Sequence, residues 1–468
     1  MMNSSKKSIK RIFILIILMF LLVIFYLLKI VVEDSKTIIT NSYNPRINAT
    51  DNSIKRGSIK DINGTVMAYS EKNGGTYERK YVDGIYSAHV LGYTGVGKAG
   101  IEANQNFTLQ KLDNETFQRV NAFLTGSEVE ANSVVLTVDD NLQKIGTDLL
   151  RTNKGAVVVI EVKTGRILCM VSKPNYDPQT VADNWDILRE SEDSPILNRA
   201  TQGVYTPGSV FKIVTAIAAM RNISDIDSFT YNCTGEDSFK DKVIHCYNKT
   251  AHGEVNLTTA FAKSCNCYFS ELGMKVGAAK LRETADSLGF NQNFIFDLDA
   301  SKSTVQIGAK ATESELVETS IGQGKTTVTP LFMASLTAAI ANDGLMMQPY
   351  IVDHIENYSG KTISTSLPNS KGNVISSDEA KKLKEMMVEV INDGTGFNAE
   401  SQYFQMAGKT GTAENPNGAD HLWFVGFAPS EDPEYAVAVV LENGDGSMNA
   451  GVIARKMLYN AINREKNQ

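Results

Sequence analysis

An uncharged apolar run near the N-terminus most constrains what this chain can fold into. The run spans Ile12–Leu28 and is extended by Ile30–Val32 past a single Lys29, and a helix over this whole stretch is long enough to cross about 30 Å of hydrocarbon. Four basic residues come just before it: Lys6, Lys7, Lys10 and Arg11. Because basic flanks stay in the cytoplasm, the sequence predicts a cytoplasmic tail over residues 1–11, a single membrane anchor over 12–32 and an extracytoplasmic remainder.

A cleaved signal peptide is the alternative interpretation of this run. The run is longer than the apolar core of a usual signal peptide, and Val31–Ser35 offers no small-x-small cleavage site. We therefore expect an uncleaved anchor, and no other stretch of the sequence approaches a membrane span.

The overall charge and the cysteines exclude several classes of function. The 468 residues carry a formal net charge of −7, and without a basic stripe this argues against nucleic acid as a partner. The five cysteines are too few for a disulfide scaffold, and their spacing is not typical of a zinc site, so no metal is expected. Cys233 and Cys246 flank a polar, turn-rich stretch, where either a disulfide or two buried free thiols would fit.

The periodicity of apolar residues predicts one sheet that is assembled from distant parts of the chain. Strand-like runs occur at residues 155–162, 166–171, 409–413, 423–428 and 435–441. The sequence between them, residues 198–344, has mainly helical character, with a helix start at Thr329-Pro330. A capping box at Ser376–Glu379 opens a later helix. Strands at both ends with helices between them indicate a sheet with an inserted helical subdomain.

Shorter signals mark turns and a strand outside these runs. Residues 56–68 have the pattern of two short strands joined by an Asn63-Gly64 turn. A further strand is expected at Val134–Val138, and Lys163-Thr-Gly165 is expected to form the tip of a hairpin.

Three short polar motifs carry the chemistry. They are Ser209-Val-Phe-Lys212, Ser264-Cys-Asn266 and Lys409-Thr-Gly411, in this order along the chain. Together they supply a serine nucleophile, a lysine one helical turn away, a hydroxyl with an amide, and a second cation on a strand. This set suits acyl transfer through a serine ester without a histidine base. Each motif recurs elsewhere in the chain, so the order of the three carries the information.

Ser209 is the candidate nucleophile and Lys212 its candidate base. Pro207-Gly208 precedes Ser209 and an apolar run follows, which places the serine at a helix start. Burial and a second cation such as Lys409 would lower the pKa of the Lys212 amine, which acts as a base only when neutral. The backbone N–H groups of Ser209 and Thr412 are the candidate oxyanion hole. The alternative for this motif is an exposed helix cap with a solvated lysine.

The other two motifs are candidates for proton relay and substrate binding. Ser264 can pass a proton to a leaving amine, and Asn266 can hydrogen-bond a peptide, although a helix cap explains the same triplet. On the strand with Lys409, Gly411 would admit a substrate backbone as an added strand, and the hydroxyls of Thr410 and Thr412 would bind a carboxylate. The alternative there is an edge strand protected by its lysine.

The histidines suggest no other mechanism. They form no metal-ligand spacing, and no Gly-x-Ser-x-Gly context surrounds Ser209. His421 lies beside Asp420 and close to Trp423 in the sequence. It could line the cleft, but we expect a structural role for it.

Longer stretches around these motifs resemble the class B, monofunctional penicillin-binding proteins. The stretches are Asn198–Ala200 with Tyr205–Lys212, His252-Gly253 with Lys263–Phe269, Gly322–Gly324 with Val328–Pro330, Ala407–Ala413 and Trp423–Pro429. Near the N-terminus, Arg56–Gly64 and Gly100–Glu102 resemble the non-catalytic pedestal of that class. The resemblance covers nearly the whole chain.

This resemblance implies a fold and a domain organisation. The fold would be α/β (α+β), with a transpeptidase domain like that of penicillin-binding proteins and serine β-lactamases. Such a domain has a central antiparallel sheet flanked by helices and an all-α subdomain. Residues 33–133 would form a small mixed pedestal or dimerisation-like domain, and residues 134–468 the transpeptidase domain, in a bacterial cell membrane protein.

The implied activity is a peptidoglycan D,D-transpeptidase without metal or organic cofactor. Ser209 would attack the penultimate D-Ala of a stem peptide, with Lys212 as base and Ser264 as relay. Asn266 would hold the acyl side, and the substrate carboxylate would bind at Lys409, Thr410 and Thr412. β-Lactams would acylate Ser209 as substrate mimics.

The resemblance also implies a partner and leaves the acceptor of the acyl group open. The segment before Val134 is too short for a glycan polymerase domain, so a multi-pass membrane glycosyltransferase is the expected partner. A D,D-carboxypeptidase differs only in using water as acceptor. The same motifs would also fit a serine β-lactamase, or a non-catalytic β-lactam sensor or scaffold.

Overall fold

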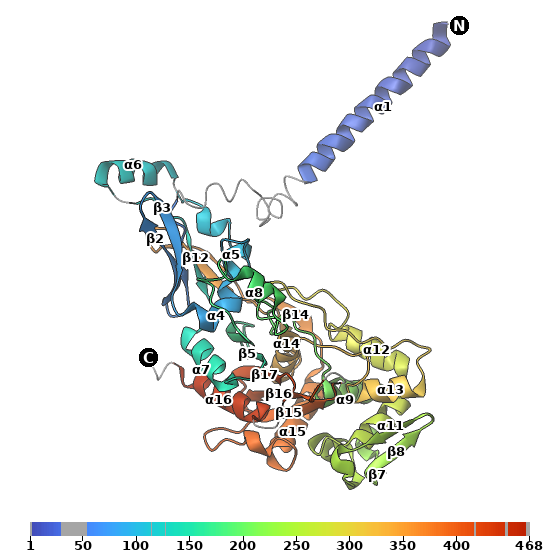
Figure 1. The fold of residues 1–468 in the computed structure, drawn as a ribbon. Coiled ribbons are helices and arrows are strands. Elements are labelled where there is room, and N and C mark those ends of the chain that lie inside the picture. Colours follow the sequence, from blue (N-terminus) through green and yellow to red (C-terminus); the bar gives the residue numbers. More distant parts are fainter. Residues whose placement is uncertain are drawn as a thin grey trace.

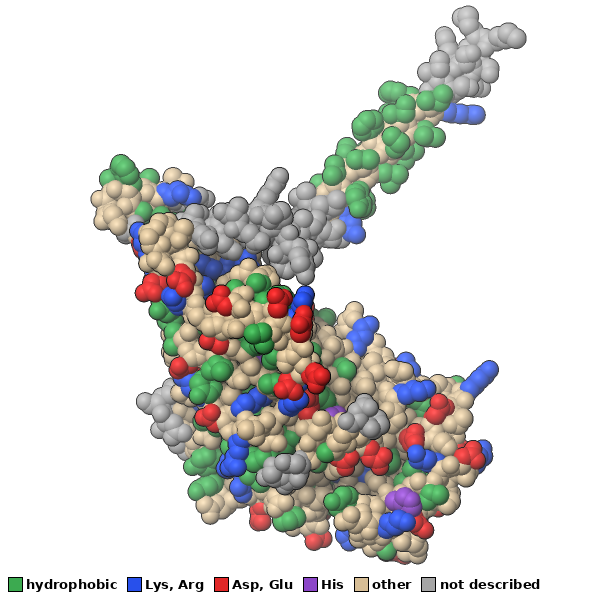
Figure 2. Space-filling model, in the orientation of Figure 1, with side chains coloured by type: hydrophobic (Ala, Val, Ile, Leu, Met, Phe, Trp, Pro, Cys, Tyr) green, Lys and Arg blue, Asp and Glu red, His purple; other side chains and the backbone are tan. Residues whose placement is uncertain are grey.

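An apolar helix begins the structure, a computed structural model that describes residues 2–29, 54–113, 115–126, 128–415, 418–444 and 448–464. Helix α1 spans Met2–Lys29, and its segment Lys10–Lys29 is long and apolar enough to cross a membrane. Hydrophobic side chains cover the face of this helix that is seen in Figure 2. The end of the predicted anchor, residues 30–32, lies outside the described residues.

A five-stranded antiparallel sheet forms the centre of the larger part of the molecule (Figure 1). Its order is β15 (Ala407–Ala413), β16 (His421–Ala428), β17 (Tyr435–Leu441), β5 (Gly155–Glu161) and β6 (Ile167–Lys173). The prediction of one sheet built from distant parts of the chain is confirmed. Every residue of β17 is buried, which explains why its sequence is continuously apolar instead of alternating.

Helices cover both faces of this sheet. One face packs against α14 (Pro330–Ala341), and the other against α7 (Asp140–Leu150) and α16 (Ala450–Ile462). Helix α14 begins as predicted, because Thr329 caps it and accepts a hydrogen bond from the Phe332 N–H. The capping box of Ser376 and Glu379 likewise opens α15 (Ser377–Asn392).

A second sheet of six strands forms the N-terminal part. Its order is β13 (Thr362–Thr365), β12 (Val352–Glu356), β4 (Ser133–Leu136), β1 (Ile59–Lys60), β2 (Val66–Asn73) and β3 (Thr76–Tyr81). Strands β1 and β2 pair in antiparallel fashion around the predicted turn. The strand predicted at Val134–Val138 is present as β4, which lies between β1 and β12. Strands β12 and β13 were not predicted, because they are short and partly exposed.

Short helices complete the N-terminal part and the region around the central sheet. They are α4 (Gly84–Leu91), α5 (Gly100–Asn104), η2 (Thr108–Gln110), α6 (Glu115–Thr125), α8 (Trp185–Glu190) and η6 (Phe397–Ala399). A small two-stranded sheet pairs β11 (Leu345–Met347) with β14 (Ser370–Asn373).

The segment between the sheet halves is a helical subdomain that also contains strands. Its helices are η3 (Gly208–Phe211), α9 (Lys212–Asn222), η4 (Ile226–Ser228), η5 (Tyr247–Lys249), α10 (Leu257–Ala262), α11 (Asn266–Val276), α12 (Ala278–Ser287) and α13 (Glu313–Ser320). Two small sheets pair β7 (Tyr231–Cys233) with β10 (Gly253–Val255) and β8 (Glu236–Phe239) with β9 (Lys242–His245). The helical prediction for residues 198–344 missed these strands because they are short and mostly exposed.

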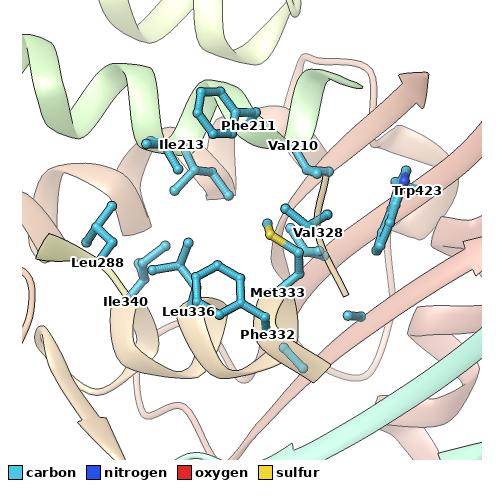
Figure 3. Close-up of a cluster of buried hydrophobic side chains, with 14 of the residues drawn as sticks. Val210, Phe211, Ile213, Leu288, Val328, Phe332, Met333, Leu336, Ile340 and Trp423 are labelled. Atoms are coloured by element: carbon cyan, nitrogen blue, oxygen red, sulfur yellow. The ribbon is translucent and has the colours of Figure 1, made fainter. Parts of the chain in front are cut away.

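A buried apolar cluster joins the start of α9 to α14 (Figure 3). Phe211 contacts Phe290 edge to face with ring centroids 5.7 Å apart, and Phe290 contacts Phe332 of α14 in the same way at 4.7 Å. At the sheet, the Trp423 Nε1–H donates to the Thr206 carbonyl at 3.1 Å. The turn that carries Ser209 is therefore held between helix α14 and the central sheet.

A buried carboxylate in the N-terminal part provides a test of its stability. Glu102 is fully buried and accepts hydrogen bonds from Arg56 Nε at 2.8 Å and Arg79 Nε at 2.6 Å. Removing one partner of a buried ion pair strands the remaining charge, so Glu102→Gln should lower the free energy of unfolding by about 3–5 kcal/mol. Denaturant titration of the full chain in detergent measures this.

The matched control is Glu128→Gln. Glu128 is partly exposed and lies 3.7 Å from Lys55 Nζ, and such a surface pair contributes less than about 1 kcal/mol. Equal losses for the two variants would contradict a special role for the buried carboxylate.

Candidate active site

Ser209 lies on a tight helix start that packs against the edge strand of the central sheet. It belongs to η3, which runs directly into α9. Gly208 adopts a left-handed φ of 54°, and a Cβ there would come within 2.3 Å of the Thr412 carbonyl oxygen. A Cβ at Gly411 would approach the Pro207 carbonyl oxygen to 3.0 Å. The two glycines therefore allow the serine turn and β15 to touch backbone to backbone.

Lys212 is a fully buried lysine whose amine donates to neutral acceptors. Its Nζ donates to the Ser264 carbonyl at 2.7 Å, to Asn266 Oδ1 at 2.6 Å and to Ser264 Oγ at 3.2 Å. The Phe269 ring centroid lies 5.5 Å from the amine. Burial lowers the pKa of Lys212 to about 8, because desolvation disfavours the charged form. A substantial neutral fraction is therefore present near neutral pH.

Lys409 approaches the same hydroxyl from the sheet. Its Nζ donates to Ser264 Oγ at 3.0 Å and to the Thr410 carbonyl at 3.1 Å, and the side chain is fully buried. Burial first, and then the charge of Lys212, hold the pKa of Lys409 well below its usual value. The hydroxyl of Ser264 thus connects two buried amines, which is the geometry needed to pass a proton between them.

The Ser264 motif is positioned by the left-handed backbone conformation of Ser264 and by the start of helix α11. Ser264 has a left-handed φ of 56°, which is uncommon for a residue other than glycine and often marks a functional site. It turns the chain between α10 and α11, and Cys265 forms the N-cap of α11. The Asn266 amide donates from Nδ2 to the His245 carbonyl at 2.8 Å. That bond fixes the amide so that its oxygen faces Lys212.

Strand β15 presents its residues alternately to the core and away from it. Lys409 and Gly411 are buried, whereas Thr410 is half-buried and Thr412 is exposed. Since side chains two apart share a face of a strand, the two threonine hydroxyls lie on the same side. Thr410 Oγ1 is hydrogen-bonded to Thr395 Oγ1. Strand β15 is also the edge of the sheet, where an extended peptide can add by backbone pairing.

The structure therefore brings most of the predicted site residues into direct contact. Hydrogen bonds join Lys212, Ser264, Asn266 and Lys409, and the backbone contact of Gly208 with Thr412 places the Ser209 turn beside β15.

A polar network beside the site was not found from the sequence. Tyr205 donates its hydroxyl to Glu442 Oε1 at 2.6 Å, and Arg199 Nε donates to the same oxygen at 2.9 Å. The His421 ring lies edge to face against Tyr205 with centroids 5.6 Å apart, and its Nδ1 accepts from the Asn443 N–H at 3.2 Å. These contacts agree with the structural role expected for His421. Arg199 and Tyr205 lie within stretches that resemble the family, but no local pattern marks Glu442.

The cysteines are free thiols in this structure. All five are buried, and the Sγ atoms of Cys233 and Cys246 are 3.6 Å apart without a bond. Of the two interpretations of this pair, buried free thiols match the structure. Cys246 also lies close to Cys265 and Cys267, directly behind the Ser264 motif.

Comparisons with known proteins agree with this geometry. Residues 155–463 match the penicillin binding protein transpeptidase domain, and residues 56–134 match the penicillin binding protein A dimerisation domain. The peptidoglycan D,D-transpeptidase PbpA of Mycolicibacterium smegmatis is 33% identical over 439 residues, covering 87% of this chain and 88% of that protein. The D,D-transpeptidase MrdA of Acinetobacter baumannii is 30% identical, covering 83% and 67%.

A solved structure extends the likeness to an acylated enzyme. The imipenem acyl-enzyme complex of penicillin-binding protein A from M. tuberculosis superposes with a TM-score of 0.82 at 32% identity, covering 88% of this chain and 99% of that one. The fold is thus the α/β transpeptidase fold, preceded by a dimerisation-type domain and one apolar helix. From these matches and the lysine–serine geometry, this chain belongs to the penicillin-binding protein transpeptidase family.

Proposed function

We propose that this protein is a peptidoglycan D,D-transpeptidase that cross-links stem peptides through an acyl-enzyme on Ser209. The observation that carries the proposal is the pair of buried amines, Lys212 and Lys409, joined by the Ser264 hydroxyl beside the Ser209 turn. Acyl transfer needs a base that is neutral near physiological pH and a path that returns the proton to the leaving group. A lysine with a pKa of about 8 and its hydroxyl neighbour provide both.

In the acylation step, neutral Lys212 takes the proton of the Ser209 hydroxyl as its oxygen attacks the penultimate D-Ala carbonyl. Lys212 lies three residues after Ser209 along one helical path, so the two side chains share a face. The proton then passes through Ser264 to the nitrogen of the departing D-Ala. In deacylation an amine of a neighbouring stem attacks the ester, loses its proton along the same path and restores Ser209.

The remaining predicted residues would bind the peptide. The N–H groups of Ser209 and Thr412 would stabilise the oxyanion, and Asn266 would hydrogen-bond the acyl side. The substrate would lie along β15, with its carboxylate at Thr410, Thr412 and the cation of Lys409. Gly411 supports this arrangement, since it keeps the strand close to the serine turn.

β-Lactams would acylate Ser209 in place of the peptide. Solved relatives carry imipenem and ceftriaxone as acyl-enzymes, and the shared fold supports the same chemistry here.

The proposal extends to topology and partner. Residues 1–11 would remain in the cytoplasm and 12–32 would anchor the chain, with 33–133 as pedestal and 134–468 as transpeptidase domain outside the membrane. Basic residues before the apolar run support this orientation. A multi-pass membrane glycosyltransferase would supply the glycan strands, because the two matched domains are a dimerisation domain and a transpeptidase domain, and neither of them polymerises glycan.

Covalent labelling tests Ser209 as the nucleophile. Full-length protein in detergent should be labelled covalently by a fluorescent penicillin, and Ser209→Ala should lose the label because the attacking oxygen is gone. The readout is in-gel fluorescence with the acylated peptide identified by mass spectrometry. Ser4→Ala, in the other Ser-x-x-Lys motif, is the matched control and should keep full labelling. Label on folded Ser209→Ala protein would exclude this mechanism.

The pH dependence of acylation tests Lys212 as the base. The pKa of Lys212 is lowered by burial to about 8, and only the neutral amine accepts a proton. The second-order rate constant of acylation by a fluorescent penicillin should therefore rise about tenfold per pH unit below that pKa and level off above it. Stopped-flow measurements from about pH 6 to about pH 9.5 test the shape.

A variant sharpens the pH test. Lys212→Arg keeps a cation that does not deprotonate in this range, so acylation should be slow at every pH. A flat profile for the native protein, with unchanged thermal stability across the range, would contradict Lys212 as the base.

A further inference from the structure

Three cysteines and a histidine from four separate segments meet behind the Ser264 motif. Cys233 ends β7, Cys246 follows β9, His252 comes just before β10, and Cys265 caps α11. One ligand atom of each residue lies within 4.8 Å of all the others. Their spacing along the chain resembles no common zinc motif, so only the fold reveals the group.

Three of the distances between these ligand atoms match a tetrahedral metal site, and the others are no longer than 4.8 Å. The Sγ of Cys246 lies 3.6 Å from that of Cys233 and 3.7 Å from that of Cys265, and Cys233 Sγ lies 3.5 Å from His252 Nδ1. With Zn–S bonds of about 2.3 Å and a Zn–N bond of about 2.0 Å, tetrahedral geometry separates two sulfurs by about 3.8 Å and a sulfur from a nitrogen by about 3.5 Å. Van der Waals contact between two thiols would explain one short sulfur–sulfur distance. It would not explain why His252 Nδ1 lies close to the same group of sulfurs.

The surroundings of the sulfurs favour the thiolate that a metal requires. Cys265 Sγ sits at the N-terminus of α11 and accepts the Tyr268 N–H at 3.4 Å. A helix N-terminus stabilises negative charge, and backbone N–H donors to sulfur typically support metal-bound thiolates. Cys233, Cys246 and Cys265 are nearly or fully buried, and His252 is half-buried.

We propose that Cys233, Cys246, His252 and Cys265 bind one Zn²⁺ through three Sγ atoms and the histidine Nδ1. Three thiols release their protons on binding, and the imidazole binds in its neutral form with its proton on Nε2. Sulfur and imidazole ligands in a tetrahedron select zinc over magnesium or calcium, which take oxygen ligands. Cys267, whose Sγ lies 3.6 Å from that of Cys246, borders the site as a neighbouring thiol.

The number of protein ligands indicates a structural zinc site and not a catalytic one. Four protein ligands complete a tetrahedron and leave no position for water or substrate. The metal would join three pieces of the subdomain: the β7–β10 sheet, the β8–β9 hairpin and the turn that holds Ser264 in its left-handed conformation.

Metal analysis of the full-length protein in detergent tests the proposal. Protein purified without chelators and with Zn²⁺ in the growth medium should contain about one zinc per chain by inductively coupled plasma mass spectrometry. Cys246→Ser should reduce this to below about 0.1, because Cys246 contacts two other ligands. Cys169→Ser is the matched control, since Cys169 is buried in β6 outside the group, and it should retain the metal.

Two further measurements, on the native protein, test the proposal even when Cys246→Ser fails to fold. Chelator treatment should lower the melting temperature, and Zn²⁺ but not Mg²⁺ should restore it. Protein loaded with Co²⁺ should show the intense thiolate-to-metal absorption of a three-sulfur site, and His252→Ala should change the ligand-field bands.

Three results would overturn the proposal. The first is folded native protein without zinc whose thiols react freely with a thiol reagent. The second is a chain mass lower by two hydrogens that a reductant restores, which indicates a disulfide. The third is zinc content unchanged by Cys246→Ser.

Discussion

The Ser264 hydroxyl between two buried lysine amines is the constraint on which the rest of the site depends. The amines of Lys212 and Lys409 donate to a hydroxyl, an amide oxygen and two carbonyls, all of them neutral. Two full positive charges this close and this deeply buried would be costly, so the site favours states in which a proton has left one amine. The neutral amine that results is what lets the site act as a base.

The residues that build the core are also the ones that bury these two amines. Helix α9 is buried over most of its length, and aromatic rings of Phe261 and Phe269 lie 5.6 Å from the amine of Lys409 and 5.5 Å from that of Lys212, respectively. The apolar run after Lys212 therefore does two things at once. It anchors the helix against α11 and α12, and it removes water from the lysine that the helix carries.

The sequence predicted those parts of the fold and site that rest on local patterns. The continuous apolar strands of the central sheet, the caps at Thr329 and Ser376 and the order of the three motifs were all readable, because each depends on neighbours in sequence. The contact of Lys409 with Ser264 could not be derived locally, since 145 residues separate them. The three motifs indicated a shared site but not which of its atoms meet. Glu442 and the cysteine–histidine group were missed, because their partners come together only through tertiary packing. The short strands β7–β10 were missed because they are mostly exposed and carry little apolar periodicity.

The six-stranded sheet has a consequence for how the chain is made. Its strands β1 to β4 emerge from the ribosome early, but β12 and β13, which extend the sheet beyond β4, belong to residues 352–365. Until those residues are synthesised, β4 has an open edge of unpaired backbone groups, of the kind that invites pairing with the wrong strand. The N-terminal part is therefore not a unit that finishes folding before the catalytic part begins. Its last strands arrive only after Ser209 and Ser264 have been made, so the two parts must mature together.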